Sequence, residues 1–237
     1  MKKTVEFKPG LFYHEVLKAN SDGILFRDAE DRNFFLNKIR AFILPCCEVW
    51  AYVILGNHVH LLLRPHPKEI LARLPLQLHL LDLDLSIANL KEYLQKDFNL
   101  RPPYALKPFQ GSIHFQIRYC IRSIKHSYDQ YSKRKYETKG VLWSRDKFTK
   151  ELPTVEDIAR TVLYIHKNPV FHGMVDQPED WQHSSYHEIL GGENRMVMRE
   201  DVLSLFRNEE TFQREHFATA SEFGRKPSQQ KVALLNR

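Results

Sequence analysis

The chain has 237 residues, of which 43% are hydrophobic and 27% charged, a composition that excludes general disorder and allows a substantial core. Its 35 Lys and Arg exceed its 29 Asp and Glu, and the formal net charge of +6 favours a polyanionic partner, although solubility alone also accounts for it. Three cysteines, no signal-peptide pattern and no apolar run of about 18 residues predict a reducing cytoplasm and no membrane span.

The first 65 residues predict a strand, a helix and a hairpin. Turn residues bracket an apolar segment at 11–17, and Asp28 can cap the helix that follows. Two apolar runs, 48–55 and 58–64, flank a Gly-Asn turn and predict two paired strands. A strand, a helix and a hairpin in this order begin an α+β fold with helices packed on an antiparallel sheet.

Two histidines, one residue apart, open the second strand of this hairpin. Side chains alternate along a strand, so His58 and His60 share one face while Val59 points into the core. Two imidazoles about 7 Å apart along a strand can both reach one metal ion. Histidines on a half-exposed face without a metal fit the same pattern, and the spacing alone leaves both interpretations open.

Residues 66–110 are bracketed by prolines, and their leucine-rich pattern predicts a helical insert. Over 112–135, apolar residues three or four apart predict a longer helix, with basic residues at its other positions. Basic and aromatic side chains together suit phosphates and stacked bases, although a solvated helix face gives the same pattern. The candidate DNA contacts of this region are Arg118, Arg122, Lys125, Lys133, Arg134, Lys135, Lys139, Trp143, Arg145 and Lys147.

Another helix begins after Thr154, which can cap it, and is expected to end at Asn168-Pro169. Tyr164 and Asn168 are four residues apart, so both can face the same point in space. A tyrosine in that setting usually packs or caps, and the pair gains meaning only beside a metal site. Residues 191–237 predict a helical extension followed by a basic tail.

Five blocks of sequence, in this order and spacing, resemble the HUH-type tyrosine transposases that act on single strands, and most closely the REP-associated tyrosine transposases. The blocks are PGLFYH at 9–14, FRDAEDR at 26–32, AYVILGNHVHLLL at 51–63, GVLWSRDKF at 140–148 and YIHKNPVFHG at 164–173. They indicate a catalytic domain over residues 1–190. The Asn-Arg-Gly that commonly follows the first strand in this family reads Ala-Asn-Ser here, at residues 19–21.

The resemblance implies a ferredoxin-like antiparallel sheet with helices on one face, and a DNA strand transferase. By motif position it implies that His58, His60 and Asn168 bind a metal ion and that Tyr164 is the nucleophile. Mixed nitrogen and oxygen ligands with open positions favour Mg²⁺ or Mn²⁺ over a closed zinc site. Tyr164 would then form a 5′-phosphotyrosine on single-stranded or hairpin DNA.

Two other functions stay open at this point. One is a DNA-hairpin-binding protein that has kept the fold and lost the chemistry, and the other is a replication initiator or relaxase that uses the same chemistry. The resemblance further implies a cytoplasmic, nucleoid-associated protein. It leaves open whether the protein is a monomer or a homodimer, and which DNA sequence it recognises.

Overall fold

A computed structural model of the chain describes residues 5–21, 23–67, 112–146, 148–191 and 196–217. The insert expected at 66–110 lies outside these residues from position 68 onward, as do Lys147 and the basic tail. Within the described ranges, no helix is both long enough and apolar enough to cross a membrane.

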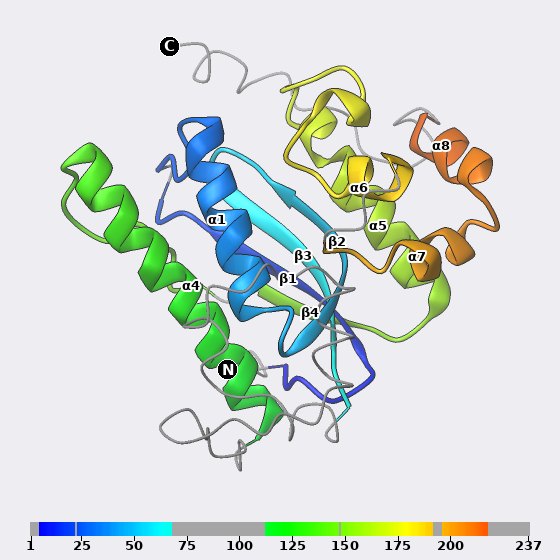
Figure 1. Ribbon diagram of the computed structural model, residues 1–237, viewed down its shortest axis with the longest axis horizontal. Helices are drawn as coiled ribbons and strands as arrows, with labels where there is room; N and C mark the ends of the chain where they lie inside the picture. The colour runs from blue at the N-terminus through cyan, green and yellow to red at the C-terminus, as the bar shows by residue number, and fades with distance from the viewer. Residues whose placement is uncertain (1–4, 22, 68–111, 147, 192–195, 218–237) are drawn as a thin grey trace, which may run out of the picture.

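Four antiparallel strands form one sheet in the order β2-β3-β1-β4 (Figure 1). The strands are β1 (Phe12–Lys18), β2 (Cys47–Ile54), β3 (His58–Pro65) and β4 (Phe148–Leu152). With helices α1 (Ala29–Phe42) and α4 (Ile113–Tyr136), the chain order is β-α-β-β-α-β. This order is that of the split βαβ, ferredoxin-like motif, and it confirms the expected α+β fold.

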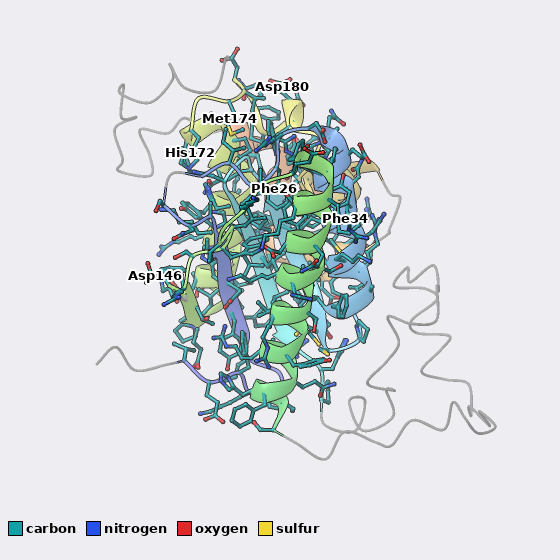
Figure 2. All side chains as sticks on the ribbon, turned by 90° about the vertical axis from the view of Figure 1, so that its left-hand side faces the viewer. Phe26, Phe34, Asp146, His172, Met174 and Asp180 are labelled. Carbon is teal, nitrogen blue, oxygen red and sulfur yellow. The ribbon has the colours of Figure 1, made fainter. Side chains whose placement is uncertain are left out.

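Helices α1 and α4 cover one face of the sheet, and Figure 2 shows α4 lying along it beside α1. Asp28 caps α1 as expected, because its side chain accepts a hydrogen bond from the Asp31 backbone N–H at 2.9 Å. Phe35 of α1 meets Tyr128 of α4 with ring centroids 5.5 Å apart, and both residues are fully buried. This layer therefore encloses the main aromatic core.

Helix α5 (Val155–Phe171) lies on the opposite face of the sheet (Figure 1). Thr154 caps it as expected, since the hydroxyl accepts from the Asp157 backbone N–H at 3.1 Å. The expected end at Asn168-Pro169 was wrong, because the helix continues to Phe171. A proline in the last turn removes only one backbone donor, and the helix ends where Gly173 adopts a φ of 64°.

The remaining elements pack beside α5 and are η2 (Pro178–Asp180), α6 (Tyr186–Gly191), α7 (Arg199–Leu205) and α8 (Glu209–Phe217). Two of their connecting segments cover the outer edge of β2. The Ile54 N–H donates to the His183 carbonyl at 2.9 Å, and the Met198 N–H donates to the Val49 carbonyl at 3.0 Å. Residues on both sides of position 191 thus share one core, and the domain boundary expected there stays a prediction.

An ion pair between the sheet and α4 lies inside the helix-covered layer. Arg118 Nη1 lies 3.0 Å from Glu15 Oε1, and Glu15 is 2% exposed. The Thr149 hydroxyl donates to the other carboxylate oxygen. Burial raises the pKa of Glu15, whereas the Arg118 guanidinium lowers it. Arg118 therefore compensates a buried charge, and this role is a structural one.

Replacing Arg118 by Ala should lower the free energy of unfolding by about 3 kcal/mol at pH 7, because the Glu15 carboxylate stays buried without its cation. Urea denaturation of the two proteins measures the difference. The double variant Glu15→Gln/Arg118→Met removes both charges and should recover most of the loss. A single variant that loses less than about 1 kcal/mol would show that the pair is solvated.

Candidate active site

The histidine pair lies on β3, on the face of the sheet that α5 covers. Antiparallel pairing places Lys18 of β1 opposite His58 and Val16 opposite His60. Val59 is fully buried, in agreement with the alternation expected from the sequence. The two imidazole rings lie 4.9 Å apart between centroids.

His14 of β1 is a third histidine at this site, and the sequence analysis did not assign it a role. Its Nε2 lies 2.8 Å from His60 Nδ1, with the two rings stacked at a centroid distance of 5.0 Å. The two residues are diagonal neighbours across the β1–β3 pair. The block at 9–14 contained His14, but only the strand register shows which face it occupies.

His58 is held between two asparagines. Its Nδ1 lies 2.6 Å from Asn57 Oδ1, and its Nε2 lies 3.3 Å from Asn168 Oδ1 on α5. A neutral imidazole has one N–H, and the shorter contact places that hydrogen on Nδ1. The lone pair of Nε2 then faces the Asn168 amide oxygen, and a cation between them would stabilise two such acceptors.

The donor atoms around this point fit a divalent metal ion. His60 Nε2 is buried and has no hydrogen-bond partner among the described residues. Neighbouring ligand atoms of an octahedral Mg²⁺ lie about 3 Å apart, close to the 3.3 Å between His58 Nε2 and Asn168 Oδ1. The described ranges hold no group of three or more His, Cys, Asp or Glu arranged to bind a metal. A site here would therefore need the amide oxygen of Asn168.

Tyr164 of α5 lies against the same histidines. Its ring centroid is 5.5 Å from that of His60 and 5.9 Å from that of His14. The residue is half-buried, and its hydroxyl has no hydrogen-bond partner in the part of the chain that the structure describes. Asn168 follows one turn later and is 1% exposed. Both residues thus face the histidine pair, as their spacing of four predicts.

His172 lies one turn beyond Asn168, at the end of α5. Its ring lies 5.2 Å from that of His58, and the residue caps the C-terminal end of α5. The sequence analysis did not single it out, although its spacing of four from Asn168 was a usable signal. The site therefore brings four histidines, one tyrosine and one buried amide together between the sheet and α5.

Burial keeps these histidines neutral near pH 7. Desolvation lowers the pKa of His14 and the pKa of His58 to about 4, in each case as the largest cause. The pKa of His60 falls well below its ordinary value, because burial and the neighbouring imidazoles both disfavour its charged form. Neutral imidazole is the form that binds metals.

Trp143, expected to stack on a base, lies in the core instead. It is 6% exposed, its ring packs against Phe35 and Tyr128, and its Nε1–H donates to the Lys125 carbonyl at 3.0 Å. Its ring is therefore enclosed, and Trp143 packs the helix layer.

The basic DNA-contact candidates divide into two groups. Those that form an ion pair or hydrogen bond within the protein are Arg118 with Glu15, Lys125 with the Ser144 carbonyl, Lys133 with Asp129, and Lys135 with Asp28, Glu30 and Asp31. Exposed ones without a carboxylate partner among the described residues are Arg122, Arg134, Lys139 and Arg145. DNA contact by the second group stays a prediction, because their charges are available to a phosphate.

The strand order and the histidine-bearing sheet face define a ferredoxin-like α+β protein whose polar site lies between sheet and helix. Comparison with known proteins adds one relative, a Haemophilus influenzae protein named as a REP-associated tyrosine transposase. It is 24% identical over 191 residues, which cover 78% of this chain and 85% of the relative. The expected resemblance to the REP-associated tyrosine transposases is thereby confirmed. No family model matches the chain.

Two solved structures match the chain at low similarity. A REP-associated tyrosine transposase bound to a REP hairpin has a TM-score of 0.49 and 16% identity, covering 82% of this chain and 87% of its own. A bacterial tRNA(His) guanylyltransferase-like protein in complex with GTP has a TM-score of 0.36 and 8% identity, covering 70% and 67%. Both scores lie under 0.5, so the fold assignment rests on the strand order and the helix placement.

The buried histidines should make the protein less stable in mild acid. Their folded pKa values lie below the unfolded value of about 6.5. Their contribution to the free energy of unfolding is therefore complete above pH 6.5 and is lost as the pH falls toward 4, because the unfolded state binds protons first. Each such histidine adds a slope of up to about 1.4 kcal/mol per pH unit. Urea denaturation between pH 7.5 and 4.5, with a chelator present, measures it.

The variant His14→Gln is the matched control for this slope. Its amide can still hydrogen-bond to His60 but cannot titrate, so its stability should fall less steeply with acid than that of the wild type. An identical slope in both proteins would mean that His14 is protonated in the folded state without cost.

Proposed function

We propose that this protein is a transposase-type enzyme that cleaves and rejoins single-stranded or hairpin DNA through Tyr164. The observation that supports this most directly is that Tyr164 packs against His60 while Asn168, one turn later, meets His58. The Haemophilus influenzae relative is named as a REP-associated tyrosine transposase. Hairpin DNA is the kind of ligand present in the structure of the REP-associated transposase.

In the proposed reaction, the Tyr164 oxygen attacks the scissile phosphorus in line with the bond to the 3′ oxygen. The phosphorus becomes bonded to the tyrosine oxygen, the tyrosine proton is lost, and the departing 3′ oxygen takes up a proton. The products are a 5′-phosphotyrosine and a strand with a free 3′-hydroxyl. One phosphodiester replaces another, so a 3′-hydroxyl can reverse the reaction without ATP.

His58, His60 and Asn168 are the residues that would hold Mg²⁺ or Mn²⁺ at this site. When bound, such an ion polarises the phosphate and withdraws charge from the transition state, which a weakly nucleophilic phenol requires. His14 and Asn57 would orient the two imidazoles through their contacts with the Nδ1 atoms. The phosphate is expected to come from an unpaired strand, because it must enter between the sheet and α5.

Replacing Tyr164 by Phe should abolish cleavage and leave DNA binding intact, because only the attacking oxygen is removed. A hairpin oligonucleotide labelled at its 3′ end should give a protein-linked band with the wild type, and a 5′ label should reveal the released strand. Denaturing gels measure both products, and anisotropy measures binding. Cleavage that persists in Tyr164→Phe would refute the assignment of the nucleophile.

Tyr119→Phe is the matched control for this experiment. Tyr119 is 45% exposed on α4, which covers the other face of the sheet, and its loss should leave both products unchanged. The same gel separates the alternatives, since a protein that only binds hairpins would give no adduct with any variant. A wild type that rejoins the cleaved DNA to an added strand and does not nick repeatedly would be a strand transferase and not a replication initiator.

Cleavage should require a divalent ion held partly by Asn168. A chelator should stop the reaction, Mn²⁺ should restore it, and Asn168→Ala should need at least about tenfold more Mn²⁺ for half-maximal cleavage. Asn168→Asp keeps an oxygen ligand and should need less Mn²⁺ than Asn168→Ala. Equal rates with and without the chelator would contradict the role of the metal.

A further inference from the structure

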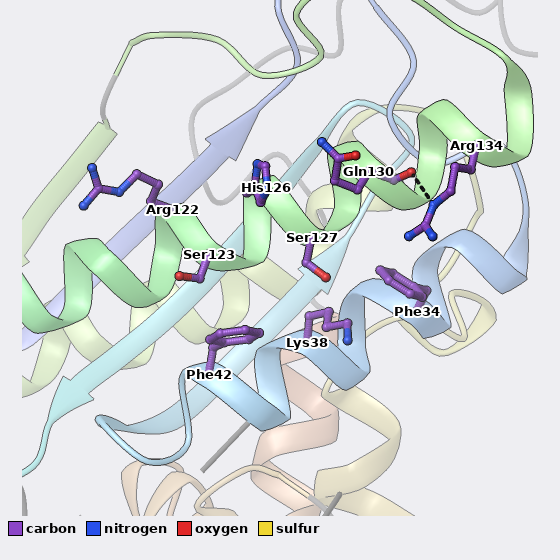
Figure 3. A pocket seen from close by; sticks show the side chains of 9 residues that line it. All are labelled: Phe34, Lys38, Phe42, Arg122, Ser123, His126, Ser127, Gln130 and Arg134. Atoms are coloured by element: carbon purple, nitrogen blue, oxygen red, sulfur yellow. Dashed lines mark hydrogen bonds between the residues drawn. The ribbon is translucent and has the colours of Figure 1, made fainter. Parts of the chain in front are cut away.

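A groove runs between α1 and α4 on the outer side of the helix layer. It has a volume of about 570 Å³ and is lined by both helices (Figure 3). From α4 come Arg122, His126, Gln130 and Arg134, each four residues after the last, with two serines beside them. From α1 come Phe34, Lys38 and Phe42, with the same spacing. Side chains four apart share one flank of a helix, so each helix presents a continuous row.

All the charged side chains that line this groove are positive. Its lining contains three cations, Lys38, Arg122 and Arg134, and no carboxylate. These three have no ion pair with a described acidic residue, whereas the neighbouring Lys133 and Lys135 are paired with Asp129 and with a cluster around Asp31. Serine hydroxyls and the Gln130 amide add uncharged hydrogen-bond donors. The groove therefore suits an extended anion that can meet several donors at once.

The length of the row matches a nucleic-acid backbone. Arg122 and Arg134 are twelve residues apart on one helix, which separates them by about 18 Å along its axis. One strand of a duplex places a phosphate every 3.4 Å or so along its axis, so the row spans about five phosphates. A single phosphate or a mononucleotide could engage only one end of the row.

The packing of Phe34 favours paired bases over unpaired ones in this groove. Phe34 is stacked on Tyr131 at a centroid distance of 4.0 Å, and Lys38 Nζ lies 5.1 Å from the centroid of the Phe34 ring. Single-strand binding surfaces use open aromatic faces on which bases stack. Phe34 is already engaged by its neighbours, so the cations and hydroxyls are left to act on a backbone whose bases stack on one another.

The groove and the histidine site lie on opposite sides of the sheet. Glu15 of β1 points to Arg118 in the helix layer, whereas His14, the preceding residue, points to His60 and Tyr164. The thickness of a helix, about 10 Å, therefore separates the groove from the sheet itself. The phosphate attacked by Tyr164 cannot be one of those in the groove.

The geometry points to the α1–α4 groove as a second nucleic-acid site, which holds the backbone of a base-paired stem while an unpaired segment of DNA occupies the histidine face. The identity of the nucleic acid as DNA and the place of the unpaired segment on the histidine face rest on the proposed function, whereas the cationic groove does not. Lys38, which the sequence analysis did not include, joins Arg122 and Arg134 as a contact residue.

The test is the triple variant Lys38→Gln/Arg122→Gln/Arg134→Gln. Its control is Lys8→Gln/Arg207→Gln/Arg214→Gln, which removes three exposed cations outside the groove. Anisotropy with a hairpin whose stem is longer than ten base pairs, and with an unpaired oligonucleotide of equal length, is measured between 50 and 300 mM KCl. Thermal melting of all three proteins should coincide, since every replaced cation is at least partly exposed.

The groove variant should bind the hairpin more weakly, and the slope of log affinity against log salt should fall by about 1 for each cation removed. The control should behave as the wild type, and binding of the unpaired oligonucleotide should be unchanged. Equal hairpin affinity in the groove variant and the control would overturn the proposal. Equal losses for the hairpin and the unpaired strand would overturn the preference for a paired stem.

The two proposals fail separately in this experiment. Cleavage of the unpaired oligonucleotide through Tyr164 should persist in the groove variant, because the histidine face is intact. Absence of cleavage in the wild type would refute the proposed function and leave the groove measurement valid.

Discussion

The pairing of β1 with β3 at the centre of the sheet is the constraint on which the other features depend. With Val16 opposite His60, every second residue of both strands faces α5, and the residues between them face α1 and α4. A shift of either strand by one residue would send its imidazoles into the aromatic core and its aliphatic residues toward Tyr164. One register therefore creates the hydrophobic core and the polar site together.

The two faces of the sheet accommodate buried ionisable side chains in different ways. On the helix-covered side, Glu15 is paired with the Arg118 guanidinium, and the pair connects the central strand to α4. On the other side, the histidines avoid a charge altogether, because desolvation lowers their pKa values and their Nδ1 atoms contact uncharged partners. A site of neutral donors can accept a dication or a phosphate without first breaking ion pairs.

Elements with strong local signals were predictable from the sequence. The caps at Asp28 and Thr154 and the turn at 56–57 each depend on a few adjacent residues, and the structure has all of them. Strand β4 was not predicted, because it is short, mostly exposed and rich in polar residues, and its partner β1 is distant in sequence. The end of α5 was misplaced because a proline in a last turn looks like a stop signal.

The candidate site was predictable only in part, for a related reason. His58, His60, Tyr164 and Asn168 were proposed from motifs, and the fold brings these four together. His14 depended on strand register, which the motif does not specify. Arg118 and Arg122 are the same residue type on the same helix, but Arg118 is half-buried against Glu15 and Arg122 is exposed in the groove. Tertiary placement alone distinguishes them.

The covered edge of β2 restricts how a second copy could join this protein. Strand addition needs an edge with unpaired backbone groups, and the segments around His183 and Met198 already use those of β2. Among the described elements, β4 is the outer strand whose far edge no other segment pairs with. A dimer built by continuing the sheet would therefore join β4 to β4, and two-fold symmetry would make that junction antiparallel and place both histidine faces on one side.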